Sequence, residues 1–348
     1  MILADNLKLS KEFGLATWWV LLLIVLLGCS ASDEPKIEAL TGLSMGTSYT
    51  VKWVNKEGED RPEVSQGVAT ELRRIEDSMS TYMDNSDLSG FNGAKVNLWH
   101  AIPAEMAALV ARSLSLSEKT NGAFDITIGP LVDLWGFGPQ PIPAKIPSQD
   151  ALDALRPVVG YQLLQVRQQP PAMRKLAPST IDLSAIAKGY GVDAVALWLE
   201  AHGINNYLVE VGGELRAHGL KLDGSPWRIA IEHPIVGAQQ VYQVVKVNNM
   251  AVATSGNYRN YYEKDGVRYS HTLNPVTLRP VTHNLASVTV IDASAARADA
   301  LATALMVMGG EDGVSWATMH QVPAYFIMKR ADGFVAQSTA GFDSYLEN

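Results

Sequence analysis

A short apolar run near the N-terminus is the feature that most constrains this chain. Residues 17–28 read TWWVLLLIVLLG, with Lys8 and Lys11 upstream, and Cys29 follows them directly. The run is too short to cross the hydrocarbon core of a membrane comfortably, which takes about 20 residues. A basic segment followed by a short apolar segment is typical of a secretory signal. We therefore predict that residues 1–28 are a signal peptide and that the rest of the chain is exported.

Cys29 is the only cysteine in the 348-residue sequence. A lone cysteine excludes an internal disulfide framework and a thiolate zinc or iron–sulfur site. Residues 26–29 (LLGC) resemble a bacterial lipobox, in which the cysteine is diacylated and becomes the mature N-terminus. The alternative is an uncleaved anchor helix, which would also tether the exported part. Residues 29–37 are accordingly predicted to be the lipidated cysteine and a flexible tether.

The remaining chain, residues 38–348, is predicted to be one domain. The sequence is 47% hydrophobic and 18% charged, which is typical of a globular protein. No repeat or low-complexity linker divides it, and we interpret residues 168–178 as an exposed loop within the domain. The net charge of −8 gives no excess of basic residues, which argues against a nucleic-acid-binding protein.

The spacing of apolar residues predicts several helices and strands. Helical spacing is found within residues 68–79, 106–114, 186–197 and 295–308, and strands are expected at 48–53, 207–211, 227–232, 241–247 and 287–291. Because several strands follow one another without an intervening helix, antiparallel pairing is expected. The sequence therefore predicts an α+β fold with a mostly antiparallel sheet and packed helices, without a Rossmann fingerprint or a P-loop.

Two segments are richer in polar residues and glycine than packing requires. Asp125 follows the helix stop at residues 121–122, where a capping or turn role is the alternative. Small residues after Asp182 open a helix whose N-terminus favours phosphate, and Lys188 lies in the same helix. A helix with Asp182 as its N-cap and one surface lysine is the alternative there.

A third segment carries a histidine and a candidate metal site. His271 lies beside the turn at Asn274 and Pro275, a usual setting for a functional loop. Asp299 and Thr303 are four residues apart, so both oxygens project from one helical face. Hard oxygen ligands at this spacing suit Mg²⁺. The alternative is a structural role, in which the aspartate lies near the start of a helix and the threonine hydroxyl bonds to the backbone of the preceding turn.

Taken together, these motifs resemble the ApbE family, the FAD:protein FMN transferases. The resemblance runs from about residue 43 to 341 and is carried by residues 45–47 (MGT), 80–82 (STY), 122–138, 182–189, 211–214 (VGGE), 254–256 (TSG), 270–280 and 299–303. It implies an ApbE-like, T-fold-like domain. It also implies that FAD is held by Met45, Tyr82, Ala123, Phe124, Asp125, Asp182, Lys188 and Leu273. Mg²⁺ would bind the backbone oxygen of Ala185, the carboxylate of Asp299 and the hydroxyl of Thr303, and His271 would be the catalytic base.

The activity implied by this resemblance is Mg²⁺-dependent transfer of FMN from FAD to a Thr or Ser hydroxyl of an acceptor protein, with AMP as the leaving group. The acceptors implied are flavoprotein subunits of membrane redox complexes, such as sodium-pumping NADH:quinone reductase and Rnf-type complexes. The expected location is the periplasmic side of the inner membrane, with the outer membrane left open. Two alternatives are Mg²⁺-dependent hydrolysis of FAD to FMN and AMP, and a lipid-anchored flavin-binding protein without activity.

Three positions depart from the family pattern. Asn274 replaces an aspartate, which keeps the turn-capping geometry but removes a charged partner for His271. Leu278 replaces a glycine, and because leucine disfavours positive φ, a turn of different shape is expected after Thr277. Ala302 stands where some members carry a second carboxylate, so a sparser metal site is expected.

The Cys29 assignment predicts the outcome of one substitution. Cys29→Ser removes the acylated sulfur, so the variant should be soluble or should retain its signal peptide, while the purified protein keeps its activity. Membrane fractionation and an activity assay in vitro test this. Loss of activity in the purified variant would show that Cys29 does more than anchor the chain.

Overall fold

The computed structural model describes residues 35–56, 61–139, 141–143, 145–235, 237, 240–258 and 260–347. Almost all of them belong to one compact unit, formed by residues 37–54 and 61–348. The predicted signal peptide and Cys29 lie outside the described residues. The first strand begins at Lys36, inside the range predicted as tether, because residues 36–44 pair with the next strand. Within the described part of the chain, no helix is long and apolar enough to span a membrane.

An eight-stranded sheet forms the centre of the unit, in the order β1-β2-β6-β7-β10-β15-β16-β17. Its strands are β1 (Lys36–Ser44), β2 (Thr47–Asn55), β6 (Tyr207–Val211), β7 (Glu214–His218), β10 (Met250–Gly256), β15 (Leu285–Asp292), β16 (Ala324–Arg330) and β17 (Gly333–Ser338). Every pair in this sheet whose register is described is antiparallel, which confirms the predicted α+β class.

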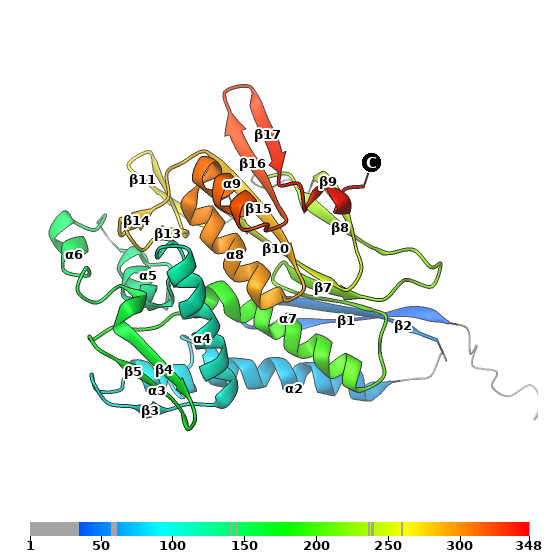
Figure 1. Cartoon of the computed structure of the whole chain (residues 1–348), viewed down its shortest axis with the longest axis horizontal. Helices are drawn as coiled ribbons and strands as arrows, with labels where there is room; N and C mark the ends of the chain where they lie inside the picture. The colour runs from blue at the N-terminus through cyan, green and yellow to red at the C-terminus, as the bar shows by residue number, and fades with distance from the viewer. Residues whose placement is uncertain are drawn as a thin grey trace, which may run out of the picture. The chain divides into compact units, whose positions relative to one another are not determined.

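Helices pack on one face of this sheet (Figure 1). They are α2 (Pro62–Met79), α7 (Ser184–Ala201), α8 (Ala295–Met308) and α9 (Gly310–Met319). Half of the residues of α7 and most residues of α8 are buried, because these two helices touch each other, the sheet and further helices. The helix predicted within residues 186–197 is confirmed as part of α7, although Leu197 is 57% exposed.

A hairpin of β8 (Trp227–Glu232) and β9 (Val241–Val247) covers part of the opposite face of the sheet. Residues alternate between buried and exposed along β8, so its inward side chains Trp227, Ile229 and Ile231 pack on the sheet. The large sheet is thus buried on both faces where β15 crosses it, and β15 is buried along nearly its whole length.

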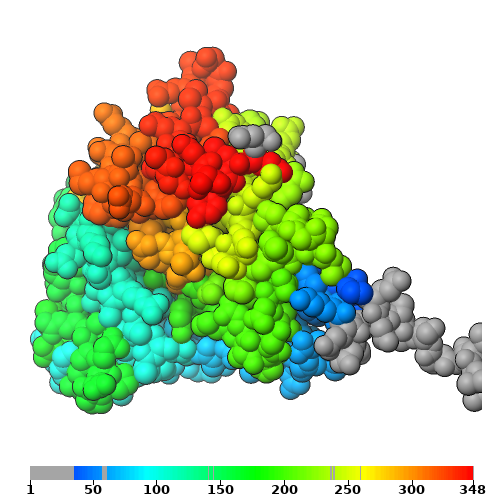
Figure 2. Space-filling model, turned by 45° about the vertical axis from the view of Figure 1, so that its right-hand side comes forward, coloured from blue at the N-terminus to red at the C-terminus, as the bar shows by residue number. Residues whose placement is uncertain are grey.

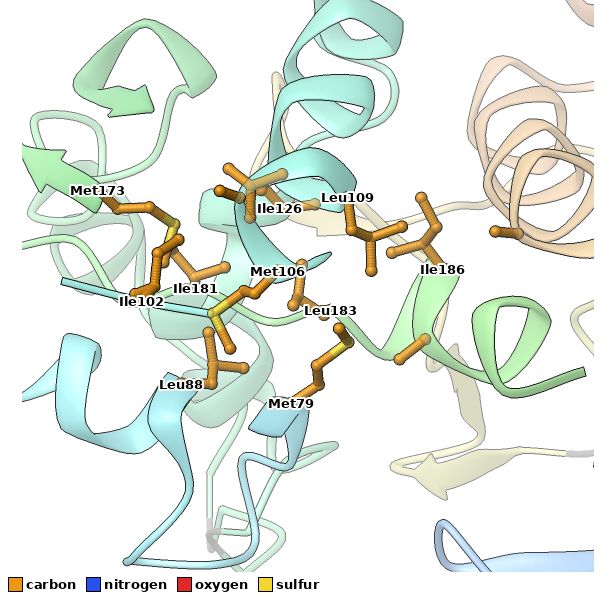
Figure 3. Close-up of a cluster of buried hydrophobic side chains, with 14 of the residues drawn as sticks. Met79, Leu88, Ile102, Met106, Leu109, Ile126, Met173, Ile181, Leu183 and Ile186 are labelled. Carbon is orange, nitrogen blue, oxygen red and sulfur yellow. The ribbon is translucent and has the colours of Figure 1, made fainter. Parts of the chain in front are cut away.

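A second hydrophobic cluster lies beneath α4 (Ala104–Lys119). In Figure 3 its labelled side chains, among them Met79, Met106 and Leu183, point toward one another from separate segments. The C-terminal half of the chain packs against this region. In the space-filling view the orange atoms of the α8–α9 region border the cyan-to-teal atoms of the region around α4 (Figure 2), and the Trp316 indole donates to the Lys119 carbonyl at 3.2 Å.

The remaining elements lie outside the large sheet, and the last of them, η3, contacts β9 rather than this cluster. They are α3 (Asp87–Asn92), β3 (His100–Ala101), η1 (Ile126–Ile128), α5 (Gly129–Trp135), α6 (Gln149–Asp153), η2 (Tyr161–Leu163), β4 (Leu164–Gln168), β5 (Pro171–Lys175), β11 (Tyr261–Lys264), β12 (Val267–Ser270), β13 (Leu273–Asn274), β14 (Arg279–Pro280) and η3 (Asp343–Tyr345). The loop predicted at residues 168–178 was wrong, because residues 171–175 form β5, the central strand of a small sheet with β3 and β4.

Candidate functional site

A cavity of about 1310 Å³ collects the residues singled out in the sequence. It lies between the β1–β2 turn, the N-terminal part of α7, the middle of α8 and the loop before β13. Its lining includes Met45, Tyr82, Ala123, Phe124, Asp125, Asp182, Ala185, Lys188, His271, Leu273, Asp299 and Thr303. The fold therefore brings together every predicted site residue of the described chain, although they are spread over more than 250 positions of the sequence.

Close packing of α7 against α8 places Asp299 in this cavity. A Cβ added to Gly189 would lie 2.3 Å from the Ala295 carbonyl oxygen, so glycine is what allows this approach. The Gly189 N–H donates to Asp299 Oδ2 at 3.1 Å. Asp299, only 2% exposed, is thus held by a backbone group of the neighbouring helix.

Lys188 lies between two buried carboxylates. Its ammonium nitrogen is 3.5 Å from Asp299 Oδ2 and 3.4 Å from Glu214 Oε1, and it also donates to the Ser184 carbonyl at 3.4 Å. Burial by itself would lower the pKa of Lys188, but the charges of Asp299 and Glu214 outweigh it and raise that pKa. Lys188 therefore keeps its positive charge inside the cavity.

Glu214 enters the cavity from the tight β6–β7 turn. Gly212 and Gly213 have φ values of +62° and +104°, which glycine adopts without strain. A Cβ on Gly212 would lie 3.2 Å from Lys188 Cδ, so the turn packs against the lysine stem. Burial raises the pKa of Glu214, Lys188 opposes this rise, and Asp299 adds to it. Glu214 Oε2 is buried and has no hydrogen-bond partner among the described residues.

Two further aspartates shape the part of the cavity nearest η1. Asp125 accepts from the Thr127 N–H at 2.8 Å and from its hydroxyl at 2.7 Å, so it has the capping role given as the alternative reading and also lines the cavity. Residues 126–128 form η1, and Asp125 is its N-cap residue. The alternative reading of Asp182 as the N-cap of α7 was wrong, because Leu183 occupies that position. Asp182 instead accepts from the Ser184 N–H at 2.7 Å.

His271 is oriented by a backbone carbonyl. Its Nδ1 lies 2.9 Å from the Asn260 oxygen, which also accepts the backbone N–H of His271 at 3.1 Å. A carbonyl oxygen can only accept, so the ring hydrogen is on Nδ1 and Nε2 keeps its lone pair. Burial lowers the pKa of His271, the Asn260 contact opposes this, and the charge of Lys188 adds to the lowering. Nε2 is therefore a neutral proton acceptor near pH 7.

The sequence model of the ApbE family matches residues 45–326. This chain belongs to the ApbE family. The FAD:protein FMN transferase of Vibrio cholerae is 42% identical over 331 residues, covering 94% of this chain and 98% of that protein. Among solved structures, the flavin transferase ApbE of V. cholerae has a TM-score of 0.83 at 41% identity, covering 90% of this chain and 100% of that one. The apo form of the Pseudomonas stutzeri flavinyl transferase ApbE has a TM-score of 0.82 at 43% identity and covers 89% and 97%. The resemblance predicted from the motifs is confirmed, as is the ApbE-like fold.

Two departures of this chain from the family pattern meet in the loop after His271. Asn274 Oδ1 accepts the N–H groups of Val276 and Thr277 at 2.9 and 3.0 Å, so the asparagine caps the turn. The expectation that Leu278 avoids positive φ was wrong, since its φ is +59°. The Leu278 N–H donates to the Asn274 carbonyl at 2.8 Å, and its own carbonyl accepts from the Trp135 indole at 3.1 Å. Its buried side chain packs in a small cluster with Leu131, Trp135, Leu152 and Leu273, which offsets the strained backbone.

Sequence reasoning missed the roles of Glu214 and of the Asn260 carbonyl. Glu214 was noticed only as part of the VGGE motif, whose paired glycines before a carboxylate were the available signal. No sequence signal pointed to the Asn260 carbonyl, because any residue type supplies one there.

The Leu278 backbone predicts an unusual order of stability. The left-handed conformation costs a non-glycine residue about 1–2 kcal/mol, and truncating a buried leucine costs about 2–5 kcal/mol. Leu278→Ala loses the packing and keeps the strain, whereas Leu278→Gly loses the packing and relieves the strain. We expect the glycine variant to be about 1 kcal/mol more stable than the alanine variant in urea unfolding.

Leu131 of α5 is the matched control, since it lies in the same cluster but in a helix. There the order should reverse, with glycine about 1 kcal/mol less stable than alanine. An alanine variant at position 278 as stable as the glycine variant would show that the turn is not strained.

Proposed function

We propose that this protein transfers FMN from FAD to a Thr or Ser hydroxyl of an acceptor protein and releases AMP. The observation that carries the proposal is that one cavity contains a buried carboxylate, a charged lysine and a neutral histidine together. The names of the relatives, FAD:protein FMN transferase and flavin transferase ApbE, support the same reaction.

The cavity suits a flavin dinucleotide in size and in chemistry. Asp125, Asp182 and the positive Lys188 offer partners for hydroxyl and phosphate groups. Tyr82 is 67% exposed at the cavity, and an exposed aromatic ring can stack on a flat heterocycle. We propose that these residues, with Met45, Ala123, Phe124 and Leu273, hold FAD.

The donor atoms in the cavity fit Mg²⁺. Both hydrogen bonds of the Asp299 carboxylate to the described residues fall on Oδ2, which leaves Oδ1 for a cation. Thr303 lies one turn further along α8, and Ala185 lines the same cavity. Within the described residues no group of three or more His, Cys, Asp or Glu side chains could hold a metal, and Mg²⁺ needs only one or two carboxylates with water and phosphate. Bound there, Mg²⁺ would neutralise charge on the pyrophosphate oxygens.

The residues of this chain have distinct parts in the transfer. Lys188 places positive charge beside the phosphate groups. His271 Nε2 accepts the proton of the acceptor hydroxyl as its oxygen bonds to the FMN phosphorus. The bond from that phosphorus to the oxygen bridging to AMP breaks, and AMP leaves with that oxygen. The Asn260 carbonyl holds the imidazole in the tautomer this step requires.

Anchoring and acceptor identity are part of the proposal. We propose that acylated Cys29 holds the domain at the periplasmic side of the inner membrane, where flavoprotein subunits of membrane redox complexes would be its acceptors. The lipobox-like residues 26–29 support the anchor.

The reaction is tested by incubating the protein with FAD and Mg²⁺, with and without an Nqr-type or Rnf-type acceptor subunit. We expect AMP release that depends on the acceptor, together with an acid-stable fluorescent band on it. Equal AMP release without acceptor would identify an FAD hydrolase. FAD binding with no AMP release under either condition would identify a flavin-binding protein.

The position of His271 predicts both a rate and a pH effect. His271→Ala should still bind FAD but transfer FMN slower by about 100- to 10,000-fold, the usual effect of a positioned base. A base acts in its neutral form, and burial lowers the pKa of His271. The wild-type rate should therefore hold from neutral pH down past the ordinary histidine value of about 6.5 and fall only below it.

His320, the C-cap residue after α9, is the control, since it is exposed and does not line the cavity. His320→Ala should keep the acidic fall in rate, whereas the residual rate of His271→Ala should lack it. An active alanine variant at 271 with an unchanged pH profile would leave His271 as a turn residue.

A further inference from the structure

Asp299 is shared between two positive partners in the proposed reaction. Its carboxylate is 3.5 Å from the Lys188 ammonium in this structure, and it is also the carboxylate proposed to bind the cation. An ammonium and a divalent cation on one carboxylate repel each other strongly at such distances. Binding of the cation therefore favours movement of Lys188 away from Asp299.

Glu214 is placed to receive the displaced ammonium. Its Oε1 is already 3.4 Å from Lys188 Nζ, so a small movement of the lysine end suffices. Its Oε2 is buried without a partner among the described residues, and Glu214 as a whole is only 4% exposed. A buried carboxylate oxygen without a donor is costly, and a second N–H from the ammonium would satisfy it.

The local backbone supports such an exchange. The Lys188 stem packs against Gly212 at the start of the same turn that carries Glu214. The turn is held by Glu210, whose Oε1 accepts the Gly213 N–H at 2.7 Å. Glu214 is therefore fixed beside Lys188 whether or not Asp299 binds a cation.

We propose that Glu214 is a positioning residue that takes the Lys188 ammonium from Asp299 when a divalent cation binds there. The cation and the ammonium can then occupy the cavity together, each with its own carboxylate. This inference rests on the proposed function, in which Asp299 binds the cation.

The test measures the affinity of the purified full chain for Mn²⁺ alone, by paramagnetic resonance of the free ion, so it needs no turnover. In Glu214→Gln the only carboxylate left beside the ammonium is Asp299, so Mn²⁺ affinity should fall by about 10- to 100-fold, the usual effect of losing a residue that supports a metal ligand. In the Lys188→Met background no ammonium competes, so the same substitution should cost only the few-fold effect of a nearby charge. Glu210→Gln is the matched control: it removes one negative charge from the same cavity lining and keeps an acceptor for Gly213, so it should change affinity by about twofold or less.

The outcomes separate this inference from the proposed function. If wild type fails to bind Mn²⁺, or Asp299→Asn binds it as tightly as wild type does, the cation assignment itself is wrong. If Asp299→Asn loses Mn²⁺ while Glu214→Gln keeps it, only the exchange of Lys188 is wrong. An equal loss from Glu214→Gln in both lysine backgrounds would mean that Glu214 acts on the cation directly. Should Glu214→Gln fail to fold in a thermal melt, Glu214→Asp takes its place, with a smaller loss that Lys188→Met again removes.

Discussion

The close approach of α7 and α8 at Gly189 is the constraint on which the site depends. Any larger residue would meet the Ala295 carbonyl and push the helices apart. Because the helices touch, the Gly189 N–H reaches Asp299, and Lys188 reaches the same carboxylate from the preceding position. The packing of α7 against α8 at Gly189 is therefore also what brings the charged groups of the cavity together.

The large sheet contributes the second carboxylate beside Lys188 and packs against α8. Glu214 follows the two-glycine turn at the end of β6, and the sheet strands β7 and β10 pack against α8. Lys188 is thus enclosed by a helix, a neighbouring helix and a strand turn, and each supplies it with an oxygen. Pairing charges of opposite sign lowers the free-energy cost of burying them. Among the described residues, Glu214 Oε2 is the oxygen of this group that has no hydrogen-bond partner.

Local signals explain which elements could be predicted from the sequence. The helix predicted at residues 295–308 matches α8 because Ser294 caps its start and Gly309, with φ +89°, ends it. The predictions for β8 and β9 match the structure because apolar and polar residues alternate along β8, and its hairpin partner follows it directly. The helix predicted at residues 186–197 lies within α7, but Leu197 is exposed there, so apolar spacing located this helix without identifying its buried side.

The features that could not be predicted from the sequence depend on packing between residues that are far apart in the chain. The predicted site residues share one cavity, but their grouping was expected from the resemblance and not from spacing alone. The left-handed Leu278 depends on a pocket formed by Leu131, Trp135 and Leu152, so its local preference was a poor guide. Glu214 contacts Lys188 only because the turn between β6 and β7 brings it there, since Lys188 lies 26 positions earlier in the chain.

The most direct test of this account is a crystal structure of the protein with Mn²⁺, located by its anomalous scattering. The account predicts a peak within about 2.2 Å of an Asp299 carboxylate oxygen, the distance expected for a small divalent cation. It also predicts that Lys188 Nζ has left Asp299 and lies within hydrogen-bond distance of both Glu214 oxygens. A peak away from Asp299, or a bound Mn²⁺ with Lys188 still on that carboxylate, would contradict it.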